Sequence, residues 1–570
     1  MGKLWRIKSK PDEEETELTV SDEVGPVIGK LLALRGIHTS DGVRAFFNPS
    51  LDDLHDPFLM ADMELAVERL TQAVHQDERI LVYGDYDVDG TTSVALVYSF
   101  LQQFHPNIDY YIPDRQDEGY GISFKGVDYA VEQDISLVVV LDCGIKAADK
   151  IEYARSQGVE FIICDHHTPG DVLPHAVACL DPKRPDCQYP DKNLSGCGVG
   201  FKFMQAYSQA NGISMEYLNR YLDLVAVSIA SDIVPVTGEN RVLADLGLRK
   251  LNENPGTGLK SIIEVAGLRD RPLTLADVVF KIGPRINAAG RVESGKAAVE
   301  LLVSEDTAKA FGMSQTINAC NETRKDLDRN ITNEALGLIA SDENQKARKT
   351  TVIFQPEWHK GVIGIVASRL TETYYKPTVV LTSSKGMVTG SARSVDGFDL
   401  YKAIEACQDL LENFGGHTYA AGFTLRPENI TAFAERFEKV VAQSIRPDQM
   451  APQIEVDAEI ALGDITYDFF EKLMRFRPFG PGNLKPVFVT RDVYDFGTSK
   501  VVGRDKEHLK LELIESTSPK IIKGIAFGQG HLLEKVKRAQ PFDICYTIEK
   551  SSSNEPMPLQ LMVKDIKFRD

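Results

Sequence analysis

Short apolar runs alternate with helical patterns between residues 79 and 180. The runs RILVYGDYD, IDYYIP, SLVVVLD, EFIICDHH and VACLD lack the polar alternation of a half-exposed strand, and single helical segments separate them. Such strands are typical of a parallel sheet that helices cover on both faces. We therefore predict a doubly wound α/β domain over residues 71–300, which a helix within 221–234 completes.

The pattern changes twice after residue 300. Residues 301–345 contain a predicted connecting helix with Ser304 as its N-cap. A second α/β pattern occupies residues 346–450, and evenly spaced short strands over 451–570 predict a small β-barrel. Residues 1–70 are then an N-terminal extension, which we expect to pack on the first domain. One face of the connecting helix is expected to be buried through Leu327, Ile331, Ala335 and Leu338.

Composition narrows the class of protein. The 570 residues suffice for three or four domains, and 43% hydrophobic with 26% charged residues excludes a disordered or fibrous chain. No apolar run approaches the ~20 residues of a membrane span, and the first residues lack the apolar centre of a secretory signal. We therefore expect a cytoplasmic protein without a membrane partner. The eight cysteines contain no CxxC pair, so ordinary free thiols are expected.

Charge is unevenly distributed along the chain. The formal net charge of −19 argues by itself against a nucleic-acid partner. Residues 471–570, however, contain 18 Lys and Arg against 13 Asp and Glu, a local net charge of +5 that leaves −24 on the remainder. A basic C-terminal module on an acidic body is compatible with a barrel that binds a polyanion.

Carboxylates and imidazoles follow successive strands of the predicted sheet. Three carboxylates at alternate positions of DYDVDGTT would repel one another strongly unless cations neutralise them. Because the carboxyl ends of parallel strands meet at one edge of a sheet, we expect the groups after three strands to lie together, with a further carboxylate from the helix near 221–234. The set consists of Asp85, Asp87, Asp89, Asp142, Asp165, His166, His167 and Asp232.

Carboxylates with imidazoles and no thiolate favour Mn²⁺ or Mg²⁺ over structural zinc. Two such ions about 3.5 to 4 Å apart activate a water and hold both apical oxygens of a phosphoryl displacement, which indicates phosphoester hydrolysis. Each signal alone has a less specific explanation. Asp142 alone is more often a helix N-cap, a DHH tripeptide is a weak signal, and DxDxDG is also found in calcium loops, although the required Glu is missing here. The ordered joint occurrence favours the metal site.

These motifs resemble the DHH phosphoesterase superfamily and, within it, the RecJ family of bacterial single-strand-specific 5′ to 3′ exonucleases. The resemblance covers nearly the whole chain, including GDYDVDGTTS, CDHH, KIGPRINAAGR, GSARS, GGHTYAAGFTL and RPFGPGNLKPVF. It implies a DHH domain, a DHH-associated domain and an oligonucleotide-binding (OB) barrel in the three predicted domains. It also implies two-metal hydrolysis of single-stranded DNA from a 5′ end to 5′-mononucleotides, in DNA recombination and repair.

The resemblance also implies roles for individual residues. His167 would face the scissile phosphate as a proton donor or electrostatic partner, Asp85 would be a further ligand or a base, and Asp165 would belong to the catalytic group. The position four before Asp87, often His in the superfamily, is Tyr83, which leaves the coordination of one metal open. The implied ligands are Asp87, Asp89, Asp142, His166 and Asp232, with Asp142 as a candidate bridge between the ions.

Several residues are candidates for contacts with DNA. Ser391 and Arg393 lie beside small residues that let backbone N–H groups approach a phosphate, and Arg115 with Tyr120 offers a cation and a stacking face. His417 lies in a Gly-rich loop that would allow close approach of a sugar-phosphate backbone. Arg285 and Arg291, with Asn287, offer similar donors, although the two arginines could instead form salt bridges between domains. The candidates in the barrel are Arg504, Lys506 and Lys510, together with His508.

Two other functions stay open at this point. A DHH phosphodiesterase of short oligonucleotides or cyclic dinucleotides would not need the barrel, and an inactive scaffold would have no reason to keep so many like charges together. The resemblance further implies a monomer that works with single-strand-binding protein and a RecQ-type helicase.

Overall fold

The computed structural model describes residues 3–9, 25–115, 117–292, 295–551 and 559–569, without the side chains of 289–292. The chain divides into two compact units, one made of Met1–Arg6 with Ala319–Glu455 and the other of Ile7–Asn318 with Val456–Asp570. Each unit has hydrophobic cores of its own. All eight cysteines are buried and none of them forms a disulfide, in agreement with the sequence.

The larger unit contains the predicted parallel sheet, with strand order β3-β2-β4-β5-β6. Alternate residues of each strand enter different cores: Val82 and Val139 pack on one face, Leu81 and Val138 on the other. Both faces are therefore covered, which confirms the doubly wound prediction. The strands are β2 (Ile80–Gly84), β3 (Ile108–Tyr111), β4 (Leu137–Leu141), β5 (Glu160–Cys164) and β6 (Ala178–Leu180).

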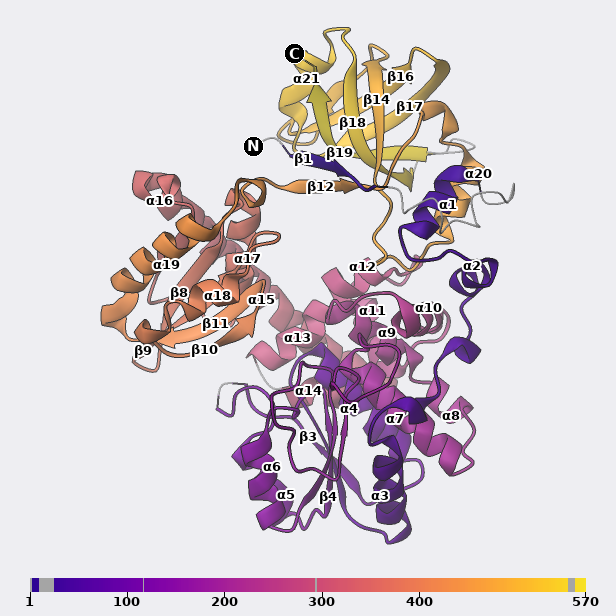
Figure 1. Ribbon diagram of the computed structural model, residues 1–570, viewed down its shortest axis with the longest axis vertical. Helices are drawn as coiled ribbons and strands as arrows, with labels where there is room; N and C mark the ends of the chain where they lie inside the picture. The colour runs from indigo at the N-terminus through magenta and orange to yellow at the C-terminus, as the bar shows by residue number, and fades with distance from the viewer. Residues whose placement is uncertain (1–2, 10–24, 116, 293–294, 552–558, 570) are drawn as a thin grey trace. The chain divides into compact units, whose positions relative to one another are not determined.

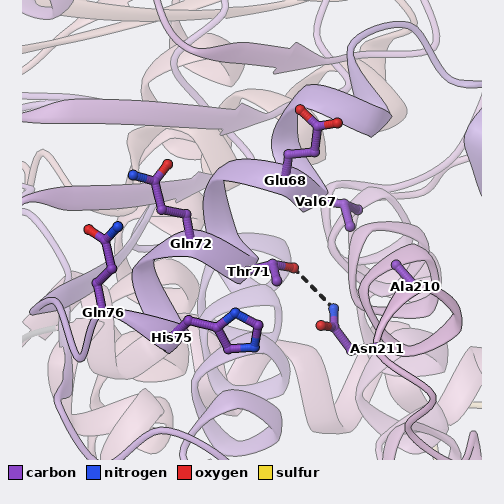
Figure 2. Close-up of a pocket in the computed structure, with 8 residues that line it drawn as sticks. All are labelled: Val67, Glu68, Thr71, Gln72, His75, Gln76, Ala210 and Asn211. Atoms are coloured by element: carbon purple, nitrogen blue, oxygen red, sulfur yellow. Dashed lines mark hydrogen bonds between the residues drawn. The ribbon is translucent and has the colours of Figure 1, made fainter.

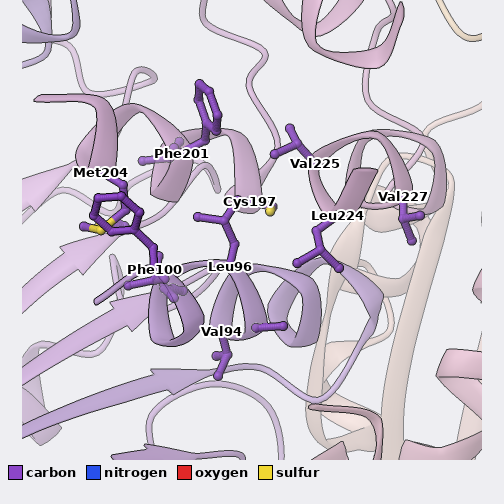
Figure 3. Close-up of a cluster of buried hydrophobic side chains, with 14 of the residues drawn as sticks. Val94, Leu96, Phe100, Cys197, Phe201, Met204, Leu224, Val225 and Val227 are labelled. Atoms are coloured by element: carbon purple, nitrogen blue, oxygen red, sulfur yellow. The ribbon is translucent and has the colours of Figure 1, made fainter. Parts of the chain in front are cut away.

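Helices cover this sheet on two sides (Figure 1). One side carries α3 (Met63–His75), α4 (Val88–Leu101), α7 (Gly196–Ala210) and α9 (Leu222–Ser231), and the other carries α5 (Phe124–Glu132) and α6 (Ala148–Ser156). Figure 3 shows α4, α7 and α9 packed through Leu96, Phe100, Cys197, Phe201 and Leu224. Each large side chain buried here contributes about 1.5 to 3 kcal/mol. This packing fixes the elements that carry the candidate site.

A long helix, α15 (Thr307–Ser341), follows as predicted. Its first turn is capped by Asp306, whose carboxylate accepts hydrogen bonds from the backbone N–H groups of Ala308 and Lys309, so the prediction of Ser304 as N-cap was wrong. Its buried face contains Ile331, Ala335 and Ile339, whereas the predicted Leu338 is 37% exposed. Between α9 and α15 lie α10 (Gly238–Glu253), α11 (Thr257–Val265), α12 (Leu275–Asp277), the π-helix η5 (Val278–Ile282), α13 (Gly283–Val292) and α14 (Gly295–Leu302).

The smaller unit is the second α/β domain, with strand order β10-β11-β9-β8-β7. Only β7 and β8 pair in parallel, and the other pairs are antiparallel. Its strands are β7 (Thr351–Phe354), β8 (Thr378–Ser384), β9 (Met387–Arg393), β10 (Leu411–His417) and β11 (Ala420–Leu425). Its helices are α16 (Glu343–Ala347), α17 (Ile363–Tyr374), α18 (Leu400–Glu405) and α19 (Ile430–Ser444), and β1 (Leu4–Ile7) pairs with β12 (Gln453–Val456).

The C-terminal strands form the predicted barrel (Figure 1). Five strands follow the order β14-β18-β19-β17-β16, and pairing of β14 with β16 closes the sheet on itself. The barrel strands are β14 (Phe488–Asp495), β16 (His508–Glu515), β17 (Ser518–Ala526), β18 (Phe542–Lys550) and β19 (Leu559–Phe568), with β13 (Ala458–Glu459), β15 (Lys500–Val502), α20 (Tyr467–Met474) and α21 (Leu533–Val536) beside them.

The N-terminal extension divides between two cores, in contrast to the expectation that all of it packs on the first domain. Helix α1 (Pro26–Ala33) buries Ile28, Leu31 and Leu32 in the core of the barrel, and α2 (Ser40–Phe47) packs there too. Residues from Leu51 onward pack on the first domain instead. The extension therefore links the barrel to the first domain.

Candidate metal centre

The imidazole of His166 lies at the carboxyl end of β5 among three carboxylates. Its Nδ1 is 3.0 Å from the carbonyl oxygen of Leu194, so Nδ1 carries the proton and Nε2 presents a lone pair. This Nε2 lies 3.2 Å from Asp142 Oδ1, 3.6 Å from Asp232 Oδ2 and 3.7 Å from Asp89 Oδ2. Neither Nε2 nor Asp142 Oδ1 has a hydrogen-bond partner among the described residues, although both are buried. An imidazole fixed through one nitrogen with the other free is the usual arrangement of a metal-binding histidine.

Asp89 is fixed by three elements. It lies in the first turn of α4, and its carboxylate accepts hydrogen bonds from the backbone N–H groups of Gly196 (2.7 Å) and Cys197 (2.8 Å) at the start of α7. The hydroxyl of Ser228 on α9 donates a third, at 2.6 Å. The N-terminus of α7 thus stabilises the negative charge. No direct sequence signal indicated Ser228.

Asp142 directly follows β4 with a φ of 61°, and its side chain lies over Gly196. A Cβ at Gly196 would be 2.6 Å from the Cβ of Asp142, so only glycine fits there. Asp142 caps no helix, because α6 begins at Ala148, which excludes the N-cap explanation. Asp87 is the residue that caps a helix: its Oδ1 accepts from Gly90 N in α4, at 3.0 Å.

The cluster holds more negative charge than its surroundings neutralise. Burial and the other carboxylates raise the pKa of Asp142 well above its usual value. Burial, with Asp87 as the nearest like charge, raises the pKa of Asp85 to about 8, and burial with Asp89 raises that of Asp232 to about 8. The pKa of Asp87 is raised for the same two reasons, burial and Asp89. Divalent cations would compensate this charge, and the buried, unpartnered oxygens are ligands suited to them.

His167 is held by Asp165 rather than by the carboxylate cluster. Its Nδ1 lies 2.8 Å from Asp165 Oδ1, while Asp165 Oδ2 accepts from Ile145 N at 2.9 Å. Burial alone would raise the pKa of Asp165, but the hydrogen bonds from His167 lower it to about 2. Burial likewise opposes the charge on His167, yet Asp165 raises the pKa of the imidazole. The Tyr120 hydroxyl lies 3.2 Å both from the Asp142 carbonyl, to which it donates, and from His167 Nε2.

Two sets of side chains each bring three possible ligand atoms within 4.8 Å of one another. One set is Asp89, His166 and Asp232, and the other is Asp142, His166 and His167. Asp85 and Asp87 adjoin these groups but are not members of them. Asp85 Oδ2 is nevertheless buried, with no hydrogen-bond partner in the described ranges. The structure therefore brings together five of the eight predicted residues. Asp165 is hydrogen-bonded to His167, and Asp85 and Asp87 adjoin the five.

Two nearby residues change the sequence-based interpretation. Tyr83 is buried, and its hydroxyl donates to Gly121 O and accepts from Ser123 N, so it is part of the core and not a substitute ligand. Asp181, which sequence reasoning missed, follows β6 and is fully buried; burial raises its pKa to about 7. It continues the pattern of an aspartate after each inner strand, and this pattern was its only sequence signal.

The candidate DNA contacts in the larger unit differ in how accessible they are. The exposed guanidinium of Arg115 lies 5.1 Å from the ring centre of Tyr86, which in turn contacts Tyr120 edge-on at 6.3 Å. Arg285 is buried, and its Nε donates to Asn318 Oδ1 at 2.9 Å. Asn287 is half-buried on α13, and the side chain of Arg291 lies outside the described residues.

In the smaller unit, Ser391 and Arg393 lie together on β9. The Arg393 Nη1 donates to Ser391 Oγ at 3.2 Å, and a Cβ at Gly364, in the first turn of α17, would be 3.0 Å from both side chains. This arrangement combines a guanidinium, a hydroxyl and a helix N-terminus, all of which suit a phosphate. His417 is exposed at the end of β10.

The predicted basic residues of the barrel lie on and before β16. Arg504, Lys506 and Lys510 are exposed, and Lys510 pairs across the strands with Lys500. The ring of His508 packs edge-on against Phe527, which is 57% exposed. The barrel therefore presents cations and an aromatic ring on one hairpin and the neighbouring turn.

A separate surface groove of about 500 Å³ lies between α3 and the end of α7 (Figure 2). Its lining includes Glu68 and His75, and Asn211 donates to the hydroxyl of Thr71 at 3.1 Å. None of the predicted site residues lines this groove. The groove is therefore separate from the candidate metal centre.

Known proteins match the chain over its whole length. The models of the DHH family N-terminal domain, the DHHA1 domain and the RecJ OB domain match residues 79–229, 347–443 and 456–565. The single-stranded-DNA-specific exonuclease RecJ of Bacillus subtilis is 35% identical over 566 residues, which are 98% of this chain and 70% of that protein. The chain belongs to the RecJ family. The RecJ of Escherichia coli is 30% identical over 586 residues, which are 99% of this chain and 100% of that protein.

A solved RecJ structure has the same fold. The crystal structure of RecJ from Thermus thermophilus in complex with Mn²⁺ matches with a TM-score of 0.85 and 26% identity, covering 100% of this chain and 80% of that one. A second structure of that protein, in complex with Mg²⁺, matches with a TM-score of 0.79. The predicted DHH, DHH-associated and OB domains are thereby confirmed. None of the helices in the described ranges combines the length and apolarity that a membrane crossing requires.

Proposed function

We propose that this RecJ-family protein is a single-stranded-DNA-specific exonuclease that hydrolyses phosphodiester bonds from a free 5′ end and releases 5′-mononucleotides, in DNA recombination and repair. The names of its full-length relatives support the activity. The observation that carries the proposal is the buried Nε2 of His166, which has no hydrogen-bond partner among the described residues and lies among three carboxylates, because such a donor set suits a divalent cation.

The residues fit two Mn²⁺ or Mg²⁺ ions. Asp89, Asp142, His166 and Asp232 would hold them, and Asp87 and Asp85 would be further candidate ligands. When bound, such ions activate a water and stabilise the charge that develops on the phosphate. The chain itself holds Asp89 through three hydrogen bonds and orients His166 through Leu194, so the donor atoms are arranged before any ion binds.

His167 would act on the scissile phosphate. Asp165 holds the ring through Nδ1, and its carboxylate raises the pKa of the imidazole, which favours the protonated form. The other nitrogen, now beside the Tyr120 hydroxyl, would donate a hydrogen bond to a phosphate oxygen or a proton to the leaving oxygen. Asp165 is a positioning residue in this scheme.

Each unit offers candidate contacts for DNA. The pair Ser391 and Arg393 would bind a phosphate at the start of α17, and Arg115 would pair with another near the metal centre. The barrel would follow the strand through Lys510 and its neighbours, while an unstacked base packs on Phe527. Single-stranded nucleic acid suits such a surface, because its bases are free to stack.

Partners are proposed on the family resemblance. We infer single-strand-binding protein and a RecQ-type helicase as partners, with the enzyme itself a cytoplasmic monomer. The single-stranded DNA substrate is supported more directly, by the names of the relatives and by the OB barrel.

End-labelling tests the proposed function. A single-stranded oligonucleotide labelled at the 5′ or the 3′ end is incubated with Mn²⁺, and the 5′ label is expected to leave first as a mononucleotide. Asp89→Ala is the matched inactive variant, and a chelator should abolish the reaction. Release of the 3′ label first would contradict the polarity. Faster turnover of a dinucleotide than of a long strand would favour the short-oligonucleotide alternative, and unchanged degradation by Asp89→Ala would remove the catalytic interpretation.

A further inference from the structure

The backbone directly after Asp232 is in an unfavourable conformation. Ile233 has a φ of 60° and is 62% exposed. A β-branched residue rarely adopts this left-handed region, since its side chain crowds the backbone, and such strain persists only where the surroundings enforce it. Asp232 is the C-cap of α9, so the strained residue is the first one beyond this candidate ligand. Contacts from elsewhere in the larger unit must therefore hold the segment in place.

A loop that precedes the barrel strands holds this segment from the other side. We call residues 476–483 the buttress loop. Val236 N donates to the carbonyl oxygen of Pro481 at 2.7 Å. The buried guanidinium of Arg241 donates to Phe476 O at 3.3 Å and to Arg477 O at 2.8 Å. The segment that follows Ile233 is thus hydrogen-bonded to the buttress loop at Val236 and at Arg241.

The backbone of the buttress loop also lies close against side chains of this segment. A Cβ at Gly480 would be 2.4 Å from Cγ2 of Val236, and one at Gly482 would be 2.9 Å from Cγ2 of Thr237. No side chain fits between them, so the loop and the segment cannot move independently.

Asn483 sets the shape of the buttress loop. Its side chain is 1% exposed, and its Nδ2 donates to Phe476 O at 2.8 Å and to Pro478 O at 2.9 Å. Its Oδ1 accepts from Arg35 Nε at 2.7 Å, and Arg35 belongs to the N-terminal extension. One buried amide therefore ties the two ends of the loop together and anchors it.

We propose that the buttress loop is a positioning element for Asp232: it enforces the strained conformation of Ile233 and so keeps the carboxylate beside His166. Asp232 Oδ2 lies 3.6 Å from His166 Nε2 in this arrangement. The barrel module then contributes to metal affinity through the backbone, without supplying a ligand. This inference rests on the proposed metal-dependent function.

Mn²⁺ affinity tests the proposal independently of activity. Free Mn²⁺ is titrated by electron paramagnetic resonance against the full chain and the variant Asn483→Ala. Loss of the amide should weaken Mn²⁺ binding about 10-fold, the lower end of the range for residues that support a ligand indirectly. Asn211→Ala is the matched control, since Asn211 also donates two hydrogen bonds from a half-buried site but lies away from Asp232. It should bind Mn²⁺ like the unchanged chain.

A second substitution separates positioning from a general loss of stability. Glycine adopts a positive φ without strain, so Ile233→Gly in the Asn483→Ala background should restore most of the lost affinity. If Asn483→Ala is unfolded by circular dichroism, Gly480→Ala, which forces the loop away from Val236, replaces it with the same expectation. Unchanged affinity in the folded variant, or a loss that Ile233→Gly does not reverse, would overturn the proposal. Absence of Mn²⁺ binding in the unchanged chain would instead overturn the proposed function.

Discussion

Replacing Gly196 by alanine is expected to disable the metal centre without removing any ligand. A Cβ at this position would lie 2.6 Å from Cβ, 2.7 Å from Oδ1 and 2.9 Å from Cγ of Asp142. Ordinary contacts begin near 3.4 Å, so Asp142 has to move by about 0.8 Å. The backbone N–H that Gly196 donates to Asp89 adjoins the same contact. The substitution therefore displaces one carboxylate and disturbs a second.

The size of the effect follows from this displacement. Misplacing a catalytic group by about 1 Å can cost roughly 100-fold in rate, which corresponds to about 2.7 kcal/mol of transition-state stabilisation. Disturbing the support of a metal ligand typically weakens metal binding by about 10- to 100-fold. We therefore expect Gly196→Ala to lower kcat/KM on single-stranded DNA roughly 100-fold, with a weaker Mn²⁺ affinity.

Gly198→Ala is the matched control, two residues further along α7. A Cβ there would meet its nearest neighbour, Ser195 Oγ, at 3.4 Å, which is an ordinary contact, and alanine favours the helix. Release of labelled nucleotides and Mn²⁺ titration are measured for both variants, with thermal melting to show that each is folded. The control should retain activity. If folded Gly196→Ala keeps full activity and Mn²⁺ affinity, Asp142 is not part of the catalytic centre and the reasoning fails.

Three further results are expected. Asp165→Asn should lower the pKa of His167, so the pH–rate limb that reports this imidazole moves to lower pH; a limb that stays in place would contradict the assignment. A carboxyl whose folded-state pKa exceeds its unfolded value destabilises the fold as the pH rises from the lower to the higher of these two values. Without metal, the melting temperature should therefore fall between about pH 4 and pH 8, and it should fall less steeply in Asp232→Asn. Equal slopes in the two proteins would contradict the raised pKa of Asp232. Lys510→Ala should reduce the slope of log affinity against log salt by about 0.7, and Phe527→Ala should weaken single-strand binding by about 1 to 3 kcal/mol at any salt; intact binding in both variants would exclude this barrel face.

The fold could be predicted well where local pattern and final burial agree. Apolar strands such as LVVVL of β4 are buried on both faces, so sequence and structure give the same answer. The prediction failed where packing decides among equivalent positions. Leu338 and Ile339 are both apolar, and only the partner surface of α15 determines that Ile339 is the buried one. The N-terminal extension was misjudged for the same reason, because nothing within α1 indicates that its partner is the barrel.

The candidate site could be predicted as a set of residues but not as an arrangement. Parallel strands bring their carboxyl ends to one edge, which is why Asp142 and His166 were expected to meet. Which aspartate caps a helix depends on where that helix begins. Asp87 is therefore a cap, whereas Asp142 Oδ1 has no hydrogen-bond partner among the described residues. The residues that hold the site's carboxylates in place come from distant positions in the sequence, such as Ser228, which donates to Asp89. No local sequence pattern indicates them.

The central claim is that these side chains close around a pair of divalent ions. Crystals grown with Mn²⁺ test it most directly, through anomalous scattering at an energy where manganese contributes. We predict two anomalous peaks at the sheet edge, ligated by Asp89, Asp142, His166 and Asp232, with at least one lost in Asp142→Asn. A well-ordered structure at saturating Mn²⁺ with no peak among these residues would contradict the claim.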